Sequence, residues 1–312
     1  MKIAFLFPGQ GAQVVGMGRD VAGSSPPAAQ IYQQANDIIG FDLSSICFHG
    51  PAEKLNTTAI SQPAIFVTSA AILQALRTNS DASHLKPDVT AGLSLGEYTA
   101  LYAAGVLSFK DALILVHKRG QAMQAAADAT EGAMVSIIGL DEEKVSQLCA
   151  EAAQGEILAA VNFNCPGQIV ISGTKSACRR AEELAAKYGA IKAVRLEVAG
   201  AFHTQMMSAA ADALKEVLQK TKVSQPCDTK IIANINADYY QTSEKIAQGL
   251  TKQLTSPILW QKCMEKLIAD GIEKFYEIGP GRVLTGLMKR ISRKTEVINI
   301  STTNAINNLL VS

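Results

Sequence analysis

Short apolar runs alternate with helical patterns along most of the chain. Residues 3–7 are an uninterrupted apolar run, and residues 88–93 are predicted as a second buried strand. Runs of this length without alternating polar positions are typical of strands buried on both faces of a parallel sheet. Helical periodicity predicts helices over 64–76, 97–104 and 109–127, and Ser108 is a suitable N-cap for the last of them.

From Gly132 the expected elements become shorter and follow a different order. Strands are expected at 133–140, 157–162, 168–173 and 191–198, with helices at 141–153 and 175–188. This β-α-β-β-α-β order is that of a ferredoxin-like unit. Longer units then resume, with helices at 209–220, 242–253, 258–269 and 283–291 and strands at 230–234, 274–278 and 296–300. We therefore expect an α/β fold whose large domain, 1–127 and 199–312, contains a parallel sheet and carries a small inserted subdomain, 128–198.

Composition narrows the possible classes of function. The formal net charge of +1 over 312 residues gives no overall basic field, so a nucleic-acid partner is not expected. The six cysteines are scattered without a C-x-x-C pair, which indicates neither a zinc site nor a redox motif. The N-terminal apolar run is too short for a signal peptide, and no uninterrupted apolar stretch is long enough to span a membrane. We expect a cytoplasmic protein, or an organelle protein whose transit peptide has been removed.

The stretch TAGLSLGEYTAL contains the pattern G-x-S-x-G around Ser94. Between a strand and a helix, this pattern can expose a serine at a sharp turn as a nucleophile. The N–H of Leu95 at the helix start would then face the oxyanion that forms on attack. The same pattern occurs in esterases, thioesterases and acyltransferases, and a serine that only caps the helix is the structural alternative.

A nucleophilic serine needs a base, and the chain has four histidines. His49 and His84 fall in predicted loop and surface stretches, and His117 falls within a predicted helix. His203 directly follows the strand predicted at 191–198, where active sites of open α/β sheets occur, at the carboxyl ends of strands. It also follows Ser94 in the chain, so it is the best candidate for the base.

Seven collinear motifs resemble the malonyl-CoA:acyl-carrier-protein transacylases of type II fatty acid synthesis. They are FPGQGAQ (7–13), GLSLGEY (92–98), RGQAM (119–123), NCPGQIVISG (164–173), GAFHT (200–204), QLTSPILW (253–260) and EIGPGRVLTGL (277–287). The resemblance implies an α/β-hydrolase-like domain with a ferredoxin-like insertion. That outline agrees with the one drawn from periodicity.

The resemblance also implies roles for individual residues. Gln10 would supply the second oxyanion N–H beside that of Leu95, and Arg119 would hold the free carboxylate of the malonyl group. Gln253 would be the partner of His203 through a carbonyl oxygen, where a hydrolase usually has an acid. Glu197, six residues before His203, is the acidic alternative, and a solvated helix-surface arginine is the alternative for Arg119.

The resemblance also implies further residues around the substrate. Asn162 and Gln168 would lie near the cleft, or would simply be polar groups of a turn and a strand. Phe202 matches the aromatic residue of malonyl-selective members and would narrow the pocket. Many members have histidine where this chain has Leu93, so any polar contribution at that position is missing.

The implied reaction uses malonyl-CoA and the phosphopantetheine thiol of an acyl carrier protein, with a malonyl-serine intermediate and no cofactor or metal. A basic stretch could meet the acidic carrier protein, or could be a solvated helix face. It consists of Arg282, Lys289, Arg290, Arg293 and Lys294. We expect a monomer. A polyketide acyltransferase, a serine thioesterase or hydrolase, and a non-catalytic carrier-binding module are the alternatives.

Overall fold

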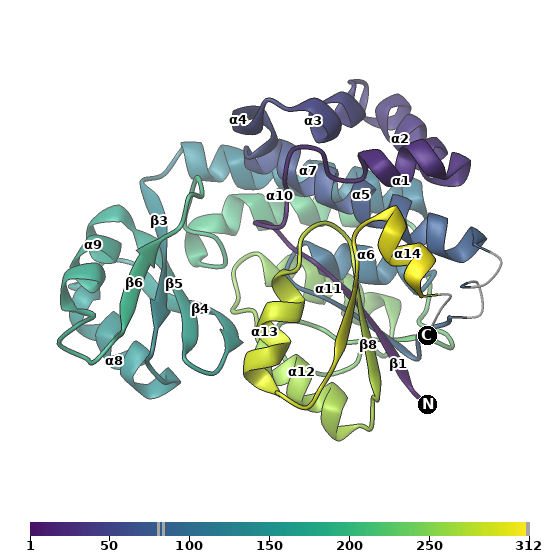
Figure 1. Cartoon of the computed structure of the whole chain (residues 1–312). Helices are drawn as coiled ribbons and strands as arrows, with labels where there is room; N and C mark the ends of the chain where they lie inside the picture. The colour runs from purple at the N-terminus through teal and green to yellow at the C-terminus, as the bar shows by residue number, and fades with distance from the viewer. Residues whose placement is uncertain (80–81, 83–84, 310–312) are drawn as a thin grey trace.

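Two β-sheets organise the chain, one parallel and one antiparallel (Figure 1). The computed structural model describes residues 1–79, 82 and 85–309. In Figure 1 the antiparallel sheet lies at the left with its two helices, and the parallel sheet lies among the other helices. The predicted fold class, α/β with a parallel sheet and a second, smaller sheet unit, is confirmed.

The parallel sheet has the strand order β7-β2-β1-β8-β9, and all its neighbouring strands are parallel. Its strands are β1 (Ile3–Phe7), β2 (Val89–Gly92), β7 (Lys230–Ile231), β8 (Lys274–Ile278) and β9 (Val297–Ile300). Phe7 pairs with Gly92 at the ends of β1 and β2. The segments that follow these two strands therefore leave the sheet side by side, at its carboxyl edge.

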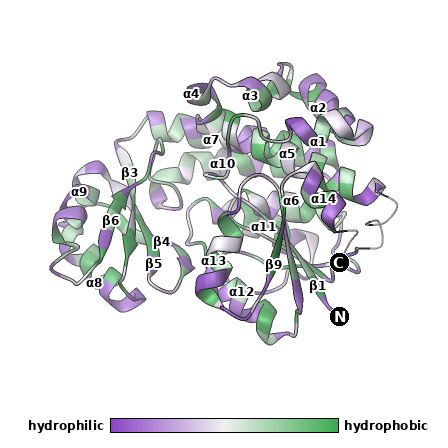
Figure 2. Ribbon diagram, in the orientation of Figure 1, coloured by the Kyte–Doolittle hydropathy of each residue, from purple (hydrophilic) through white to green (hydrophobic). Residues whose placement is uncertain are grey.

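Both faces of the parallel sheet are buried, which explains why its strands read as continuous apolar runs. In β1, residues 3, 5 and 7 pack into one hydrophobic cluster with α5 (Thr58–Thr78) and α7 (Phe109–Asp128). Residues 4 and 6 pack into a second cluster with α12 (Trp260–Ala269) and α13 (Val283–Ile291). Figure 2 shows apolar residues along the strands and hydrophilic residues on outward-facing helix surfaces.

The helices of the N-terminal part are α1 (Arg19–Ser24), α2 (Pro26–Ile39), α3 (Leu43–His49), α4 (Ala52–Leu55), α5 (Thr58–Thr78), α6 (Gly96–Ala103) and α7 (Phe109–Asp128). Those of the C-terminal part are η1 (Gln205–Met207), α10 (Ser208–Leu218), α11 (Ser243–Gln253), α12 (Trp260–Ala269), α13 (Val283–Ile291) and α14 (Thr303–Asn308).

The antiparallel sheet has the order β4-β5-β3-β6 and forms the expected β-α-β-β-α-β unit. Its elements are β3 (Gly132–Ile138), α8 (Glu142–Ala153), β4 (Leu158–Cys165), β5 (Gln168–Thr174), α9 (Lys175–Leu184) and β6 (Lys192–Arg195). One face of the sheet packs against α8 and α9 in a hydrophobic cluster of its own. The ferredoxin-like order read from the sequence is confirmed.

Main-chain hydrogen bonds join the two sheet units near β4. The Ile258 N–H donates to the Val161 carbonyl at 2.7 Å, and the Phe163 N–H donates to the Ile258 carbonyl at 2.9 Å. The guanidinium of Arg290, on α13, donates to the side chain of Gln168 and to the Pro166 carbonyl in the β4–β5 turn. The antiparallel unit is thus attached to the segment that precedes α12 and to α13.

Several predicted boundaries differ from the structure. The helix expected at 64–76 is the longer α5, which starts six residues earlier and contains Pro63. Sixteen of its residues are buried. The strand expected at 191–198 is only Lys192–Arg195, and the helix expected at 175–188 ends at Leu184. His49 ends α3 rather than lying in a loop, and His84 falls outside the described residues.

One helix, α5, is long and apolar enough to cross a membrane by length and composition. Of its most apolar 18-residue window, 83% is buried inside the fold. No membrane-spanning stretch is expected from the sequence at this helix, because Gln62 and other polar residues interrupt its apolar run. Its packing against α7 and α2 makes it the central helix of the larger hydrophobic cluster.

Candidate active site

Ser94 lies at a sharp turn between β2 and α6. Its φ of 51° is in the left-handed region, which non-glycine residues rarely adopt. The two glycines of G-x-S-x-G make the turn possible, because a Cβ on Gly92 would lie 1.9 Å from the backbone of Gly96. A Cβ on Gly96 would in turn lie 2.1 Å from the Phe7 carbonyl oxygen. The sequence pattern therefore reflects close backbone packing on both sides of the serine.

His203 connects Ser94 to Gln253. The Ser94 Oγ lies 3.0 Å from His203 Nε2, and His203 Nδ1 lies 2.8 Å from the main-chain carbonyl oxygen of Gln253. Since a carbonyl can only accept, Nδ1 must carry the proton, and Nε2 presents its lone pair to the serine hydroxyl. This is the geometry that a serine nucleophile and its base require. Glu197 lines the same cavity, but the partner of His203 Nδ1 is the Gln253 carbonyl.

The environment keeps the His203 imidazole neutral. Burial lowers its pKa to about 4, and the positive charge of Arg119 adds to that effect, while the Gln253 carbonyl acts in the opposite direction. His203 is also held at a φ of 63°, so both members of the pair have unusual backbone conformations. At neutral pH the ring is therefore free to take up a proton from the serine.

Arg119 projects from the middle of α7 and is 1% exposed. Its Nη1 donates to Gln62 Oε1 at 2.7 Å, and its Nη2 donates to Ser94 Oγ and to Gln253 Oε1, both at 2.9 Å. The guanidinium also lies over the ring of Tyr98. Its Nε is buried and has no hydrogen-bond partner in the described part of the chain. Arg119 is therefore no solvated surface arginine but a buried cation beside the candidate nucleophile.

Two backbone N–H groups face the space beside Ser94. Gln10 follows the end of β1 and Leu95 follows Ser94, and both residues line one cavity with the serine. Across residues 1–79, 82 and 85–309, neither of these N–H groups donates to another backbone or side-chain acceptor. Unpaired N–H groups in this position are suited to an oxyanion.

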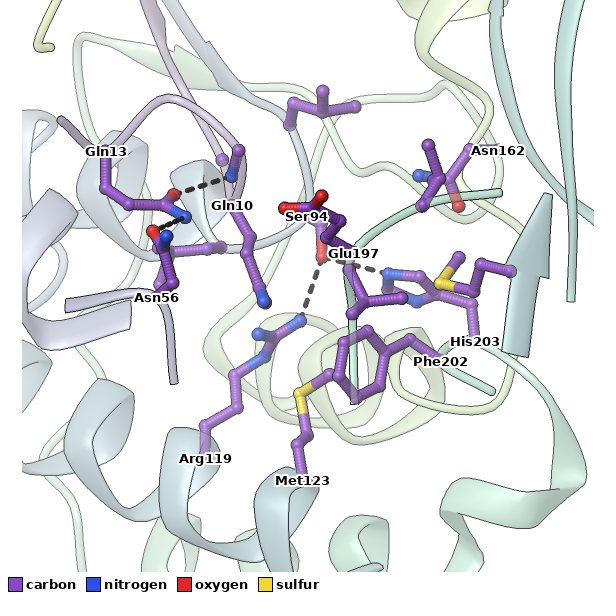
Figure 3. A pocket seen from close by; sticks show the side chains of 17 residues that line it. Gln10, Gln13, Asn56, Ser94, Arg119, Met123, Asn162, Glu197, Phe202 and His203 are labelled. Atoms are coloured by element: carbon purple, nitrogen blue, oxygen red, sulfur yellow. Dashed lines mark hydrogen bonds between the residues drawn. The ribbon is translucent and has the colours of Figure 1, made fainter. Parts of the chain in front are cut away.

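The cavity around Ser94 has a volume of about 500 Å³. It is lined by Gly9, Gln10, Gly11, Gln13, Asn56, Leu93, Ser94, Leu95, Arg119, Met123, Met134, Asn162, Leu196, Glu197, Val198, Phe202 and His203. Figure 3 shows Ser94 between His203 and Arg119, with Phe202 and Met123 below them. Both sheet units contribute, because Met134 and Asn162 come from the antiparallel one. Asn162 lines the cavity, and its Oδ1 is a buried atom without a partner among the described residues.

Gln253 contacts His203 and Arg119 without lining the cavity, and Gln168 is the other predicted site residue that does not line it. Gln168 Oε1 accepts a hydrogen bond from Arg290 at 2.9 Å, at the joint between the β4–β5 turn and α13. The NCPG turn brings Asn162 to the cavity through the preceding strand β4, whereas Gln168 begins β5 on the other side of the turn. The structure therefore gives Gln168 a contact with α13, and its place at the substrate stays a prediction.

Sequence reasoning missed four polar side chains that surround the site. Gln62 accepts from Arg119, and Asn234 accepts the N–H of Ser94 at 2.6 Å. Glu97 and Tyr240 lie behind Gln253, and the Tyr240 hydroxyl donates to Glu97 Oε1 at 2.5 Å. Glu97 stands within the quoted GLSLGEY motif, three residues after Ser94, but a charge in the first turn of a helix usually faces solvent. Within the described residues, no group of three or more His, Cys, Asp or Glu side chains is arranged to hold a metal ion.

Fold and site together define an enzyme that handles acyl groups through a serine. A strand–serine–helix turn, a neutral histidine base and two free N–H groups can form and break an acyl-serine ester. A family model described as "Acyl transferase domain" matches residues 4–306, so the chain belongs to the acyl transferase family. The resemblance drawn from the seven motifs is thereby confirmed.

Several individual proteins are similar to this chain over nearly its whole length. The chain is 45% identical over 301 residues to the malonyl CoA-acyl carrier protein transacylase of Bacillus subtilis, covering 96% of this chain and 93% of that protein. It is 41% identical to the enzyme of the same name from Haemophilus influenzae, with 99% of each chain covered. The structure is similar to the acyl carrier protein S-malonyltransferase of Vibrio cholerae, with a TM-score of 0.94, 41% identity and coverage of 99% and 100%. It is also similar to a malonyl-transacylase solved in complex with a type II PKS acyl-carrier protein, with a TM-score of 0.95, 40% identity and coverage of 100% and 99%.

Proposed function

We propose that this protein transfers a malonyl group from malonyl-CoA to the phosphopantetheine thiol of an acyl carrier protein, for fatty acid synthesis. The observation that carries the proposal is Arg119, a buried guanidinium 2.9 Å from the Ser94 hydroxyl. No carboxylate in the described ranges forms an ion pair with it. A malonyl group carries the carboxylate that such a fork of donors can bind, and an acetyl group does not. The names of the relatives point to the same substrate and acceptor.

In the first half-reaction, the Ser94 Oγ attacks the thioester carbonyl of malonyl-CoA while His203 Nε2 takes the hydroxyl proton. The bond from Oγ to the carbonyl carbon forms, and the N–H groups of Gln10 and Leu95 stabilise the oxyanion. The carbon–sulfur bond then breaks, and coenzyme A leaves with the proton from His203. Malonyl-Ser94 remains, with its carboxylate against Arg119.

In the second half-reaction, the phosphopantetheine thiol of the carrier protein attacks the malonyl-serine ester. His203 takes the thiol proton and returns a proton to Ser94 as the ester bond breaks. Phe202 and Met123 form an apolar side of the cavity that excludes larger acyl groups. Asn162 lines the opposite wall.

The carrier protein would dock on the basic stretch at and after α13. Residues Arg282, Lys289, Arg290, Arg293 and Lys294 are all exposed there, although Arg290 also contacts the β4–β5 turn. Exposed positive charge of this kind accelerates the approach of an acidic partner. A relative of this chain has been solved with an acyl-carrier protein, which supports this type of partner.

Intact-mass spectrometry tests the proposal directly. Purified protein mixed with malonyl-CoA should gain one malonyl group, and addition of holo-acyl carrier protein should return the protein to its original mass and place the malonyl group on the carrier. Ser94→Ala should gain no adduct. Arg119→Ala should acylate more slowly with malonyl-CoA than wild type does.

The alternative reactions give different products in the same experiment. A thioesterase would release free malonate continuously without a carrier protein, and a carrier-binding module would form no adduct. Either result would reject malonyl transfer as the function of this site. Malonyl transfer to carrier proteins of polyketide synthesis but not to those of fatty acid synthesis would reject the proposed pathway alone.

A further inference from the structure

Glu97 is a fully buried carboxylate directly behind the candidate nucleophile. It lies in the first turn of α6 and is 0% exposed. Its Oε2 accepts from Gln253 Nε2 at 2.8 Å and from the Asn234 N–H at 3.2 Å, while its Oε1 accepts from Tyr240. Burial raises the pKa of Glu97 to about 7, and these hydrogen bonds act against that rise. No step of the proposed reaction uses this carboxylate.

The two residues that donate to Glu97 Oε2, Asn234 through its main-chain N–H and Gln253 through its side-chain amide, also hold the backbone of Ser94. Asn234 Oδ1 accepts the Ser94 N–H at 2.6 Å, and Asn234 Nδ2 donates to the Gly92 carbonyl at 2.8 Å. Gln253 Nε2 donates to the Ser94 carbonyl at 3.0 Å. The N–H and the carbonyl of Ser94 are therefore bound by the side chains of two residues that both donate to one carboxylate oxygen, Asn234 from its main chain and Gln253 from its side chain.

These hydrogen bonds hold Ser94 in an unfavourable backbone conformation. A serine at a φ of 51° persists only where its surroundings over-determine it. The residues that hold it come from α6, the segment after β7 and the end of α11. Gln253 also accepts from Arg119 through Oε1 and from His203 through its main-chain carbonyl. Fixing the side-chain amide of Gln253 thus fixes its contacts with the Ser94 carbonyl and with the Arg119 guanidinium.

We propose that Glu97 and Asn234 are positioning residues that hold the Ser94 turn in its reactive conformation, Asn234 directly and Glu97 through Asn234 and Gln253. The inference rests on the proposed role of Ser94 as nucleophile. It adds that this nucleophile owes its geometry to a buried carboxylate that never touches the substrate. A displacement of about 1 Å in such a group can cost about 100-fold in rate.

Reaction with phenylmethanesulfonyl fluoride isolates this effect from substrate binding. Ser94 Oγ displaces fluoride from the sulfonyl sulfur, His203 takes the hydroxyl proton, and the adduct is read by intact mass. The reagent carries no carboxylate, so it makes no use of Arg119 as a clamp. Glu97→Leu should slow labelling about 100-fold. Glu97→Gln should remain within about tenfold of wild type, because its amide oxygen can accept the same two N–H donors.

Glu277 provides a matched control outside the site. It is equally buried, and it accepts the N–H groups of Leu284 and Thr285 at the start of α13. Glu277→Leu should lower the thermal unfolding temperature as Glu97→Leu does, yet leave the labelling rate of the folded protein unchanged. If Glu97→Leu does not fold, Asn234→Ala carries the same expectation of slow labelling.

The outcomes separate this inference from the proposed function. Wild-type protein that fails to label at Ser94 would overturn the role of Ser94 as nucleophile. Normal labelling of wild type with equally fast labelling of the folded Glu97→Leu or Asn234→Ala variant would overturn the positioning role alone. Equal slowing in Glu277→Leu would also overturn it, because the effect would then reflect general loss of stability.

Discussion

Arg119 combines a high desolvation cost with neutral partners. Its hydrogen bonds go to a glutamine oxygen, a serine hydroxyl and a second glutamine oxygen. A buried guanidinium surrounded by neutral acceptors is poorly compensated until an anion arrives. The same cation lowers the pKa of His203, so Arg119 acts on the candidate base as well as on the acyl group.

Arg119→Ala should therefore change the choice between malonyl-CoA and acetyl-CoA. We expect malonyl transfer to fall about 100-fold or more, because a charge-assisted pair in a buried site is lost. The ratio of acetyl-CoA to malonyl-CoA use should rise. Steady-state kinetics with both thioesters measures the ratio, and Arg119→Lys, which keeps the charge but loses the fork, should recover only part of the malonyl rate. An unchanged ratio would contradict the carboxylate role.

The titration of His203 should be shifted strongly downward. With a pKa near 4, the neutral ring would persist from neutral pH down to about pH 5, whereas an ordinary histidine is largely protonated there. NMR of histidine-labelled protein measures this, and His203→Asn assigns the signal. In Arg119→Gln the pKa should move upward, since a nearby positive charge is removed. Titration of His203 near 6.5 in wild type would contradict the burial argument.

At the residue level, the sequence predicts what is local and misses what is distant. Ser94 and His203 follow from a turn motif and from the ends of predicted strands, and Gln10, Arg119 and Gln253 follow from a family resemblance. Asn234 reaches Ser94 from 140 positions further along the chain, and no local pattern marks it. These two kinds of contact explain why the predicted site contains the reacting groups but lacks their supports.

Among the elements, the strand–turn–helix around Ser94 has the least room for change. A Cβ at Gly92 would lie 1.9 Å from Gly96, against backbone that cannot move aside. Gly92→Ala should lower the free energy of unfolding by about 2 kcal/mol or more, as overpacking does. Gly286→Ala in α13 is a matched control, because a Cβ there meets nothing within 4 Å. That variant should gain about 0.5–1 kcal/mol, and urea unfolding measures both.

Element predictions succeed where burial gives a clear period. The strands at 3–7 and 274–278 are buried on both faces and are predicted within a residue of their observed ends. The Ser108 cap of α7 is also confirmed, since its hydroxyl accepts the Asp111 N–H. The sequence analysis assigned no helices between residues 14 and 57, where the structure has four. Three of these are seven residues or shorter, too short to establish a helical period.

At the scale of the whole molecule, the cavity is a joint product of two sheet units. The loop after β1 and the Ser94 turn form one wall, while β4 and the segment 196–198 form the other. The units meet through main-chain hydrogen bonds at Ile258 and through Arg290. The boundaries at residues 128 and 198 stay a prediction, but the lining shows that neither unit alone would enclose the substrate.

Malonyl-CoA should therefore stabilise both units when it binds. The Ser94→Ala variant is used because it keeps Arg119 and cannot form the acyl-serine ester. At 100 times its Kd, malonyl-CoA should raise the free energy of unfolding of this variant by about 2.7 kcal/mol. For a chain of this size, that corresponds to a rise of several degrees in Tm, roughly 5 °C. Hydrogen exchange should show added protection at 8–13 in the large unit and at 160–163 and 196–203 on the opposite wall. Coenzyme A, which lacks the malonyl carboxylate, is the matched control ligand and should protect the inner cavity less. Protection confined to one unit would contradict a shared cavity, because a ligand that contacts both walls must reduce the opening of both.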